Sequence, residues 1–157
     1  MAPSLDPQVR EVLARALYED PLWGSDSPDE SVDPPGSPAW DSLTQGERTR
    51  MLGRADKLAA MLGTIGVAVV PAGQGGQVLE IGPAELELLA QEEHRRWMRM
   101  RGTDGWRRGR VKDSARKTHP SMIPYSELPE SERDKDRERV LRFPQLLAQA
   151  GLGVHRS

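Results

Sequence analysis

Two tryptophans lie within a run of cationic side chains in the second half of the chain. Trp97 and Trp106 alternate with Arg101, Lys112 and Lys117. A flat indole ring can stack on a nucleobase, an interaction worth about 1–3 kcal/mol. Lysine and arginine bind phosphate oxygens, and arginine can do so through two parallel hydrogen bonds. This combination predicts a site for an anion with an aromatic part, such as a nucleotide.

The positive charge is concentrated in this part of an otherwise balanced chain. The 157 residues include 22 Lys or Arg and 24 Asp or Glu, for a net charge of −2. Residues 95–117, here called the basic segment, hold ten of the cationic residues and only two aspartates. A balanced chain argues against sequence-specific binding of nucleic acid, whereas the local cluster indicates an anionic partner.

Other aromatic and polar residues complete the candidate ligand-binding set. His94, His119 and Tyr125 flank the basic segment, and Trp23 from the first half of the chain could close the site. Each also has a structural interpretation. Trp97 lies on an apolar helical stripe, Trp23 can be a packing residue instead, and His119 before a proline is typical of a structural hydrogen-bonding role.

The residues that enzymes use are not arranged for catalysis. The chain has no cysteine, and its three histidines lack the spacing of a zinc-binding helix. The sequence from Gly73 to Gly76 lacks the lysine that follows in a phosphate-binding loop. Glu92 and Glu93 are neighbours on a helix and point about 100° apart. We therefore expect no catalytic residues, no metal and no cofactor.

The periodicity of apolar residues predicts a mainly α fold with minor short strands. Asp6 and Pro7 begin the first helix, and Thr44 with Glu47 forms a capping box for the second. Gly66 and Gly151 are expected to end helices in the left-handed conformation, and Pro144 to kink or restart the last one. The expected helices cover residues 6–20, 44–65, 84–100 and 129–150, and the expected strands residues 67–70 and 152–155.

Residues 24–39 are rich in glycine, serine, proline and aspartate, and this composition predicts a disordered loop. Nothing in the sequence has the length and apolarity of a membrane span, and the N-terminal residues lack the pattern of a signal peptide. We therefore expect a cytoplasmic protein without membrane insertion.

The two halves of the chain align when the sequence is shifted by 85 residues. Trp40 then meets Tyr125, Leu62 meets Leu147 and Gly66 meets Gly151. This register predicts two helix-loop-helix units, residues 1–75 and 76–157, related by a pseudo-twofold axis within one compact domain, with a cleft between them. The alternative is that any two amphipathic helix pairs align this well.

Residues 84–155 resemble the ryanodine receptor repeat domain. The motifs that carry this resemblance are the pair His94 and Trp97, Gly105-Trp106, Gly109, Asp113, Lys117, His119-Pro120, Pro124-Tyr125, Leu128-Pro129 and Glu132. The first half of the chain lacks most of these motifs, so the resemblance implies either a degenerate repeat or an adaptor of the kind found before such domains in bacteria.

The resemblance implies a non-catalytic domain. In the calcium-release channels, paired repeats bind adenine nucleotides between two units with tryptophans stacked on the base, and prokaryotic members accompany signalling and defence proteins. The resemblance implies a nucleotide-type ligand, of the adenine, cyclic or ADP-ribose type, and an effector protein as a further partner. The alternatives are a protein-interaction module that docks the basic segment on an acidic surface, and a hydrolase or transferase acting on a nucleotide.

Overall fold

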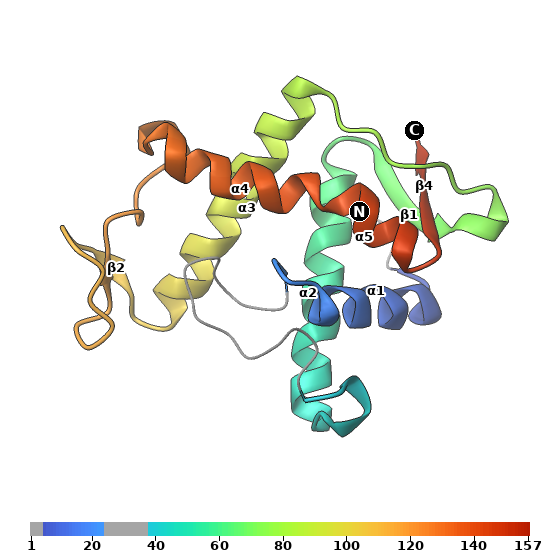
Figure 1. Ribbon diagram of the computed structural model, residues 1–157, viewed down its shortest axis with the longest axis horizontal. Helices are drawn as coiled ribbons and strands as arrows, with labels where there is room; N and C mark the ends of the chain where they lie inside the picture. Colours follow the sequence, from blue (N-terminus) through green and yellow to red (C-terminus); the bar gives the residue numbers. More distant parts are fainter. Residues whose placement is uncertain (1–4, 24–37) are drawn as a thin grey trace. The chain divides into compact units, whose positions relative to one another are not determined.

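The computed structural model describes residues 5–23 and 38–157, which are mainly helical, as expected (Figure 1). The chain forms two compact units. Unit 1 comprises residues 1–81 and 142–157, and unit 2 comprises residues 82–141. The chain therefore leaves unit 1 after its first 81 residues, builds unit 2, and returns to complete unit 1.

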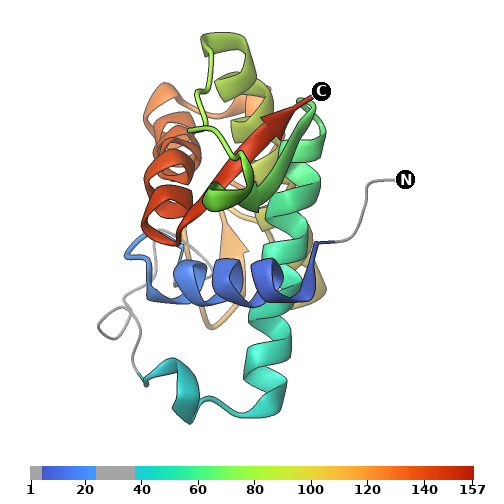
Figure 2. The same cartoon turned by 90° about the vertical axis from the view of Figure 1, so that its right-hand side faces the viewer.

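Helices α1 (Pro7–Glu19) and α2 (Gln45–Gly63) form the first helix pair of unit 1, and α1 crosses α2 (Figure 2). Asp6 caps α1, because its carboxylate accepts hydrogen bonds from the backbone N–H groups of Gln8 and Val9 at 3.1 and 3.2 Å. Thr44 Oγ1 caps α2 by accepting from the Glu47 N–H at 3.1 Å. The second bond of the expected capping box differs. The Glu47 carboxylate accepts a hydrogen bond from the Thr44 hydroxyl rather than from the backbone N–H of Thr44.

A two-stranded antiparallel sheet joins distant parts of the chain within unit 1. Strand β1 (Val67–Pro71) pairs with β4 (Leu152–Arg156), with Val69 opposite Val154. Each strand follows a glycine at φ 73°, Gly66 before β1 and Gly151 before β4, so both expected left-handed helix ends are confirmed. The 3-10 turn η2 (Ala72–Gln74) follows β1.

Pro144 marks the predicted break in the last helical stretch. Helix α4 (Glu130–Leu141) ends in unit 2 and α5 (Phe143–Gln149) begins in unit 1, with Pro144 in its first turn. Proline has no N–H to donate to the preceding turn, so a continuous helix cannot form there. Helix α5 packs on α1, and the core of unit 1 contains almost fully buried side chains from α1, α2 and α5: Leu13, Leu17, Leu62, Phe143 and Leu147.

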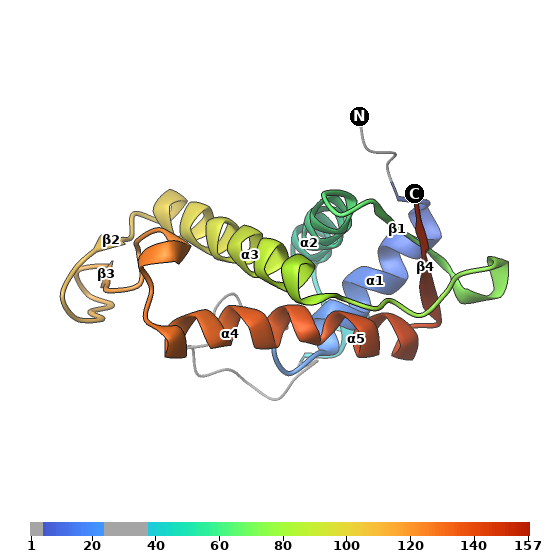
Figure 3. The ribbon, with the colours of Figure 1, turned by 90° about the horizontal axis from the view of Figure 1, so that it is seen from above.

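Unit 2 is built on helix α3 (Pro83–Thr103), which lies alongside α4 (Figure 3). In the sequence between these two helices come two two-residue strands, β2 (Arg107–Arg108) and β3 (Thr118–His119), which pair in parallel. The 3-10 turn η3 (Tyr125–Glu127) then leads into α4. The sequence of residues 102–124 predicts no regular element, because strands of two residues are too short to show the alternation of a β-strand.

The positions of the helices and of strands β1 and β4 agree with the sequence predictions to within a few residues. The repeat units at residues 1–75 and 76–157 and the pseudo-twofold relation between them stay predictions. The prediction of a disordered loop at residues 24–39 lies outside the described residues except for its last two. In the parts of the chain that the structure describes, no helix is long and apolar enough to cross a membrane.

Candidate functional site

Four of the candidate residues form one aromatic cluster in unit 2. The His94 ring stacks on Trp97 with centroids 5.6 Å apart, and His119 meets Trp97 edge-on at 5.1 Å. Tyr125 from η3 lies 6.3 Å from the ring of His94. Only 6% of Trp97 is exposed, and its indole Nε1 has no hydrogen-bond acceptor among the described residues. The cluster thus holds a buried donor that the described fold leaves unsatisfied.

His94 is held between two acceptors. Its Nε2 lies 2.6 Å from the carbonyl oxygen of Ile123, and its Nδ1 lies 3.5 Å from Asp136 Oδ2 on α4. A neutral imidazole has only one N–H, so donating to both partners requires the imidazolium form. Burial lowers the pKa of His94, but the hydrogen bonds with Asp136 and Ile123 and the charges of Asp136 and Glu93 outweigh it and raise this pKa above its ordinary value.

This arrangement predicts that unit 2 loses stability as the pH rises. Protonated His94 favours the folded state, so its contribution is complete below the unfolded pKa of about 6.5 and is lost as the pH rises through the folded pKa. Burial also raises the pKa of Asp136, although His94 opposes this effect. A raised pKa of Asp136 likewise makes the free energy of unfolding fall as the pH rises. Urea unfolding at pH 6 and above pH 8 should show the loss.

Two histidine variants check this prediction. His94→Gln should flatten the decline of the unfolding free energy with pH, since glutamine does not titrate. His155→Gln changes an exposed histidine on β4 and should leave the decline unchanged. A decline that persists in His94→Gln would assign the pH dependence to other groups, of which Asp136 has a raised pKa and faces His94.

A buried ion cluster lies beside the aromatic rings. Glu93 is 1% exposed and accepts two hydrogen bonds from the Arg96 guanidinium at 2.7 and 2.8 Å. Arg139, also 1% exposed, reaches the same carboxylate from α4 at 3.3 Å. Glu93 on the apolar stripe of α3 is the sequence signal for a partly polar interior, but its partners are not evident from the sequence.

A second polar network fixes Tyr125 at the edge of unit 2. Its hydroxyl donates to Glu87 at 2.7 Å, and Arg137 binds the same carboxylate at 2.7 Å. Hydrogen bonds from Tyr125 and Arg137 lower the pKa of Glu87, while burial and the Glu87 charge raise the pKa of Tyr125. The hydroxyl of Tyr125 thus has a protein partner, and its ring is the part left for other contacts.

Trp106 stands at the start of β2, half-exposed, with Arg101 from the end of α3 against its ring. The guanidinium carbon lies 4.9 Å from the ring centroid, a cation–π distance. Lys117 Nζ donates to the carbonyl oxygen of Asp104 at 2.7 Å and so closes the loop across its base. Lys117 is also the one described non-glycine residue with positive φ, at 56°.

Three arginines of the basic segment are exposed cations. Arg107, Arg108 and Arg110 are exposed, and no acidic residue in the described ranges pairs with them. Lys112 and Arg116 are exposed as well, and Arg116 lies 3.8 Å from Asp113. The Asp113 carboxylate accepts from the backbone N–H groups of Ala115 and Arg116, so this acid orders the turn. The arginines thus present uncompensated positive charge to solvent.

The absence of a side chain at Gly109 allows β2, which carries Arg107 and Arg108, to pair with β3. A Cβ atom at this position would lie 2.5 Å from Thr118 Cβ, which belongs to the backbone-proximal part of the side chain and cannot move away alone. We expect Gly109→Ala to reduce the free energy of unfolding by about 1–3 kcal/mol, as measured by urea denaturation. Gly102→Ala, in open space on α3, should be neutral or stabilising. Equal effects would contradict this role of Gly109.

The ninth candidate residue, Trp23, lies in unit 1 and packs there. Its ring centroid is 5.1 Å from that of Phe143, and its backbone carbonyl accepts from Arg54 at 2.9 Å. Trp23 is 4% exposed. The chain segment before it is anchored by Asp20, which pairs with Arg142 at 2.5 Å.

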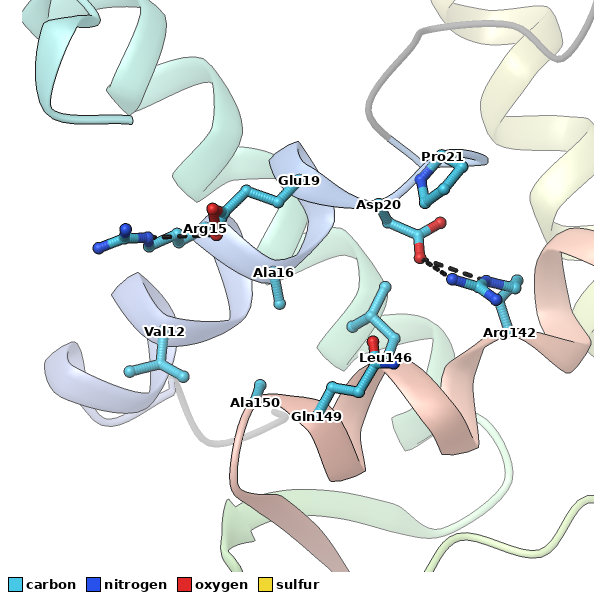
Figure 4. A pocket seen from close by; sticks show the side chains of 10 residues that line it. All are labelled: Val12, Arg15, Ala16, Glu19, Asp20, Pro21, Arg142, Leu146, Gln149 and Ala150. Carbon is cyan, nitrogen blue, oxygen red and sulfur yellow. Dashed lines mark hydrogen bonds and ion pairs between the residues drawn. The ribbon is translucent and has the colours of Figure 1, made fainter. Parts of the chain in front are cut away.

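Unit 1 also contains a pocket of about 290 Å³ between α1 and α5 (Figure 4). Val12, Ala16 and Leu146 give it an apolar wall, and the Asp20–Arg142 ion pair closes one end. The small side chain of Ala16 leaves this space open. No residue of the candidate set lines it, and the sequence offers no signal for it, because it arises from the crossing of two helices distant in the chain.

Unit 2 therefore brings together His94, Trp97, His119 and Tyr125, and it places Arg101 on Trp106. The ligand-binding roles assigned to the nine candidate residues stay predictions. Within residues 5–23 and 38–157, no group of three or more His, Asp or Glu residues is arranged to hold a metal ion. The chemistry that the surface of unit 2 offers is a half-exposed indole next to unpaired guanidinium groups, which suits an anion with a planar part.

Comparison with protein families gives one match. Residues 83–156 match the RyR domain family, and this range covers α3, the whole basic loop, α4, α5 and β4. No curated protein matches the chain.

Proposed function

Because residues 83–156 belong to the RyR domain family, we propose that this chain is a non-catalytic cytoplasmic module that binds a nucleotide or a nucleotide-derived anion. The observation that carries the proposal is the half-exposed ring of Trp106, followed directly by Arg107 and Arg108, whose guanidinium groups have no acidic partner among the described residues. The base stacks on the ring and the phosphates bind the cationic residues between 107 and 117.

The aromatic cluster contributes to the same proposal. Trp97 has an indole donor without an acceptor, which a polar ligand atom can satisfy if the ring becomes accessible. A buried donor without a partner costs about 1–3 kcal/mol, so a ligand that supplies the acceptor gains this amount. Since Trp97 is buried, the half-exposed Trp106 makes the first contact with the base, and Trp97 contributes if the cluster opens.

The proposal is tested by titrating the full chain with adenine nucleotides, cyclic nucleotides and ADP-ribose in isothermal titration calorimetry. Trp106→Ala should weaken binding by about 5- to 150-fold, which corresponds to the loss of one stacked base. The double change Lys112→Ala with Lys117→Ala should weaken binding and reduce its dependence on salt. Arg95→Ala removes an arginine that pairs with Glu92 at 2.6 Å, and it should leave the affinity unchanged.

Binding without turnover separates this proposal from a nucleotide hydrolase or transferase. After prolonged incubation with the protein, the nucleotide should be recovered intact by ion-exchange chromatography. Recovery of a hydrolysed or transferred product would replace the binding module by an enzyme.

A protein-interaction module is the second candidate, and the exposure of Val111 favours it. This side chain is 67% exposed between Arg110 and Lys112, an arrangement that fits an acidic protein surface with an apolar point of contact. If no nucleotide binds the folded protein at millimolar concentration, the interaction module should replace the nucleotide-binding proposal.

A further inference from the structure

We infer that three exposed arginines of unit 2, Arg107, Arg108 and Arg110, bind a single-stranded oligonucleotide through several phosphates, in preference to a mononucleotide. The inference rests on the proposed function, because it uses the same ring and the same cations. It adds the class of ligand, because three arginines at successive positions of the loop have no acidic partner among the described residues.

Arg107, Arg108 and Arg110 differ from three other arginines of unit 2 in having no acidic partner among the described residues. Arg95 pairs with Glu92 at 2.6 Å, Arg133 with Glu130 at 2.8 Å, and Arg137 with Glu87 at 2.7 Å. The exposed side chains of Arg107, Arg108 and Arg110 have no such acid among the described residues. Exposed cations without an acid among the described residues stay available for a partner with negative charge.

The backbone places these three cations at successive positions rather than around one point. Arg107 and Arg108 form β2 and Arg110 lies in the bend that follows it, with consecutive Cα atoms about 3.8 Å apart. Successive side chains of a strand point to opposite faces, so Arg107 and Arg108 diverge. A ligand that contacts all three must therefore carry phosphates at several points.

The platform for such a ligand is fixed rather than flexible. The Arg107 N–H donates to the Lys117 carbonyl at 2.9 Å, and the Gly109 N–H donates to that of His119 at 3.3 Å. Thr118 Oγ1 donates to the Val111 carbonyl at 3.0 Å, which holds the start of the turn against β3. Trp106 at the head of β2 offers one ring, so one base stacks while the backbone of the strand follows the arginines.

An anionic membrane would also attract the cations, but the observations favour the oligonucleotide. Val111 is the single large apolar side chain that this loop exposes among the described residues, and one valine gives little insertion into a bilayer. Trp106 is held against Arg101 at 4.9 Å rather than at the tip of the loop, a position that suits stacking. Membrane binding is therefore an outcome that the experiment must distinguish.

The test titrates a labelled oligothymidine of about 12 nucleotides with the full chain and follows its fluorescence anisotropy. The titration is repeated at salt concentrations between about 50 and 200 mM to obtain the association constant at each. Contact with three phosphates predicts a slope of about −2 in the logarithm of the association constant against the logarithm of salt concentration, and thus about a 16-fold loss over this range. Inorganic phosphate, thymidine monophosphate and ATP serve as competitors, and each should displace the oligonucleotide only at concentrations at least about tenfold higher.

The triple change Arg107→Ala, Arg108→Ala and Arg110→Ala should remove most of the salt dependence and weaken binding by at least about tenfold. Since these side chains are exposed and unpaired, the melting temperature should stay the same, and Arg95→Ala is the control with a paired arginine. Mononucleotide binding as tight as oligonucleotide binding would overturn the inference and leave the proposed function standing. Binding of neither would overturn both. Binding to phosphatidylserine vesicles, lost in Val111→Glu but not in Val78→Glu, without oligonucleotide binding would also overturn the inference.

Discussion

Replacing Glu93 by glutamine should reduce the free energy of unfolding by about 3–5 kcal/mol, whereas replacing its neighbour Glu92 should cost less than about 1 kcal/mol. The two residues are adjacent on α3, and each pairs with an arginine three positions along the helix at nearly the same distance, 2.7 and 2.6 Å. Burial and a second cation, Arg139 at 3.3 Å from Glu93, separate the two acids. The side chains of Glu92 and Arg95 are 32% and 55% exposed, whereas those of Glu93 and Arg96 are 2% and 9% exposed.

The large cost follows from the two cations that Glu93 serves. Arg96 and Arg139 both direct their guanidinium groups at its carboxylate, and a neutral glutamine leaves them with one fewer buried anion. Asp136 is the remaining buried acid of the cluster and offsets part of the loss. Breaking a buried ion pair from one side is expensive, because the charge left behind has lost its hydration without its partner.

Urea denaturation of both variants measures the difference, and a second substitution tests its cause. Glu93→Gln combined with Arg139→Leu removes a cation together with the anion, and it should recover part of the lost stability. If Glu93→Gln costs no more than Glu92→Gln, the buried cluster does not hold unit 2 together.

The sequence predicts the helices and strands of unit 1 because each boundary has a local chemical signal. Asp6 and Thr44 start helices by capping, Gly66 and Gly151 end helical stretches at positive φ, and Pro144 interrupts the last helix. These signals act within a few residues, so a single sequence contains them. The short strands β2 and β3 have no comparable signal, because their pairing depends on Gly109 meeting Thr118 across a turn.

The candidate site is predictable only as a list of residues. The sequence identifies His94, Trp97 and His119 as candidates, but it does not show that the two histidine rings both contact Trp97 or that Trp97 is buried. Burial depends on side chains from β3, η3 and α4 that converge on α3 from positions distant in the chain. The same holds for Arg139, whose burial against Glu93 cannot be read from a helix as polar as α4. A cation without an acidic partner in the described part of the chain, such as Arg108, is identified only from the positions of the acids around it.

Trp23→Ala should reduce the free energy of unfolding by about 3–5 kcal/mol, which makes Trp23 a packing residue of unit 1. Its indole ring packs against Phe143 at a centroid distance of 5.1 Å, and Phe143 is completely buried. Truncation to alanine removes a large apolar surface and leaves a cavity in a core that relaxes only in part. Trp23→Phe retains an aromatic contact with Phe143 and should lose less stability.

Trp106→Ala is the matched control, since it removes a tryptophan that is half-exposed. It loses a cation–π contact with Arg101, worth about 0.5–1 kcal/mol at an exposed position. Urea unfolding followed by circular dichroism measures both variants, and calorimetry measures nucleotide binding below the unfolding transition. We expect Trp23→Ala to lower stability while the folded fraction binds nucleotide with unchanged affinity. Trp106→Ala should weaken nucleotide binding and change stability little. Loss of affinity in Trp23→Ala without loss of stability would instead make Trp23 a ligand contact.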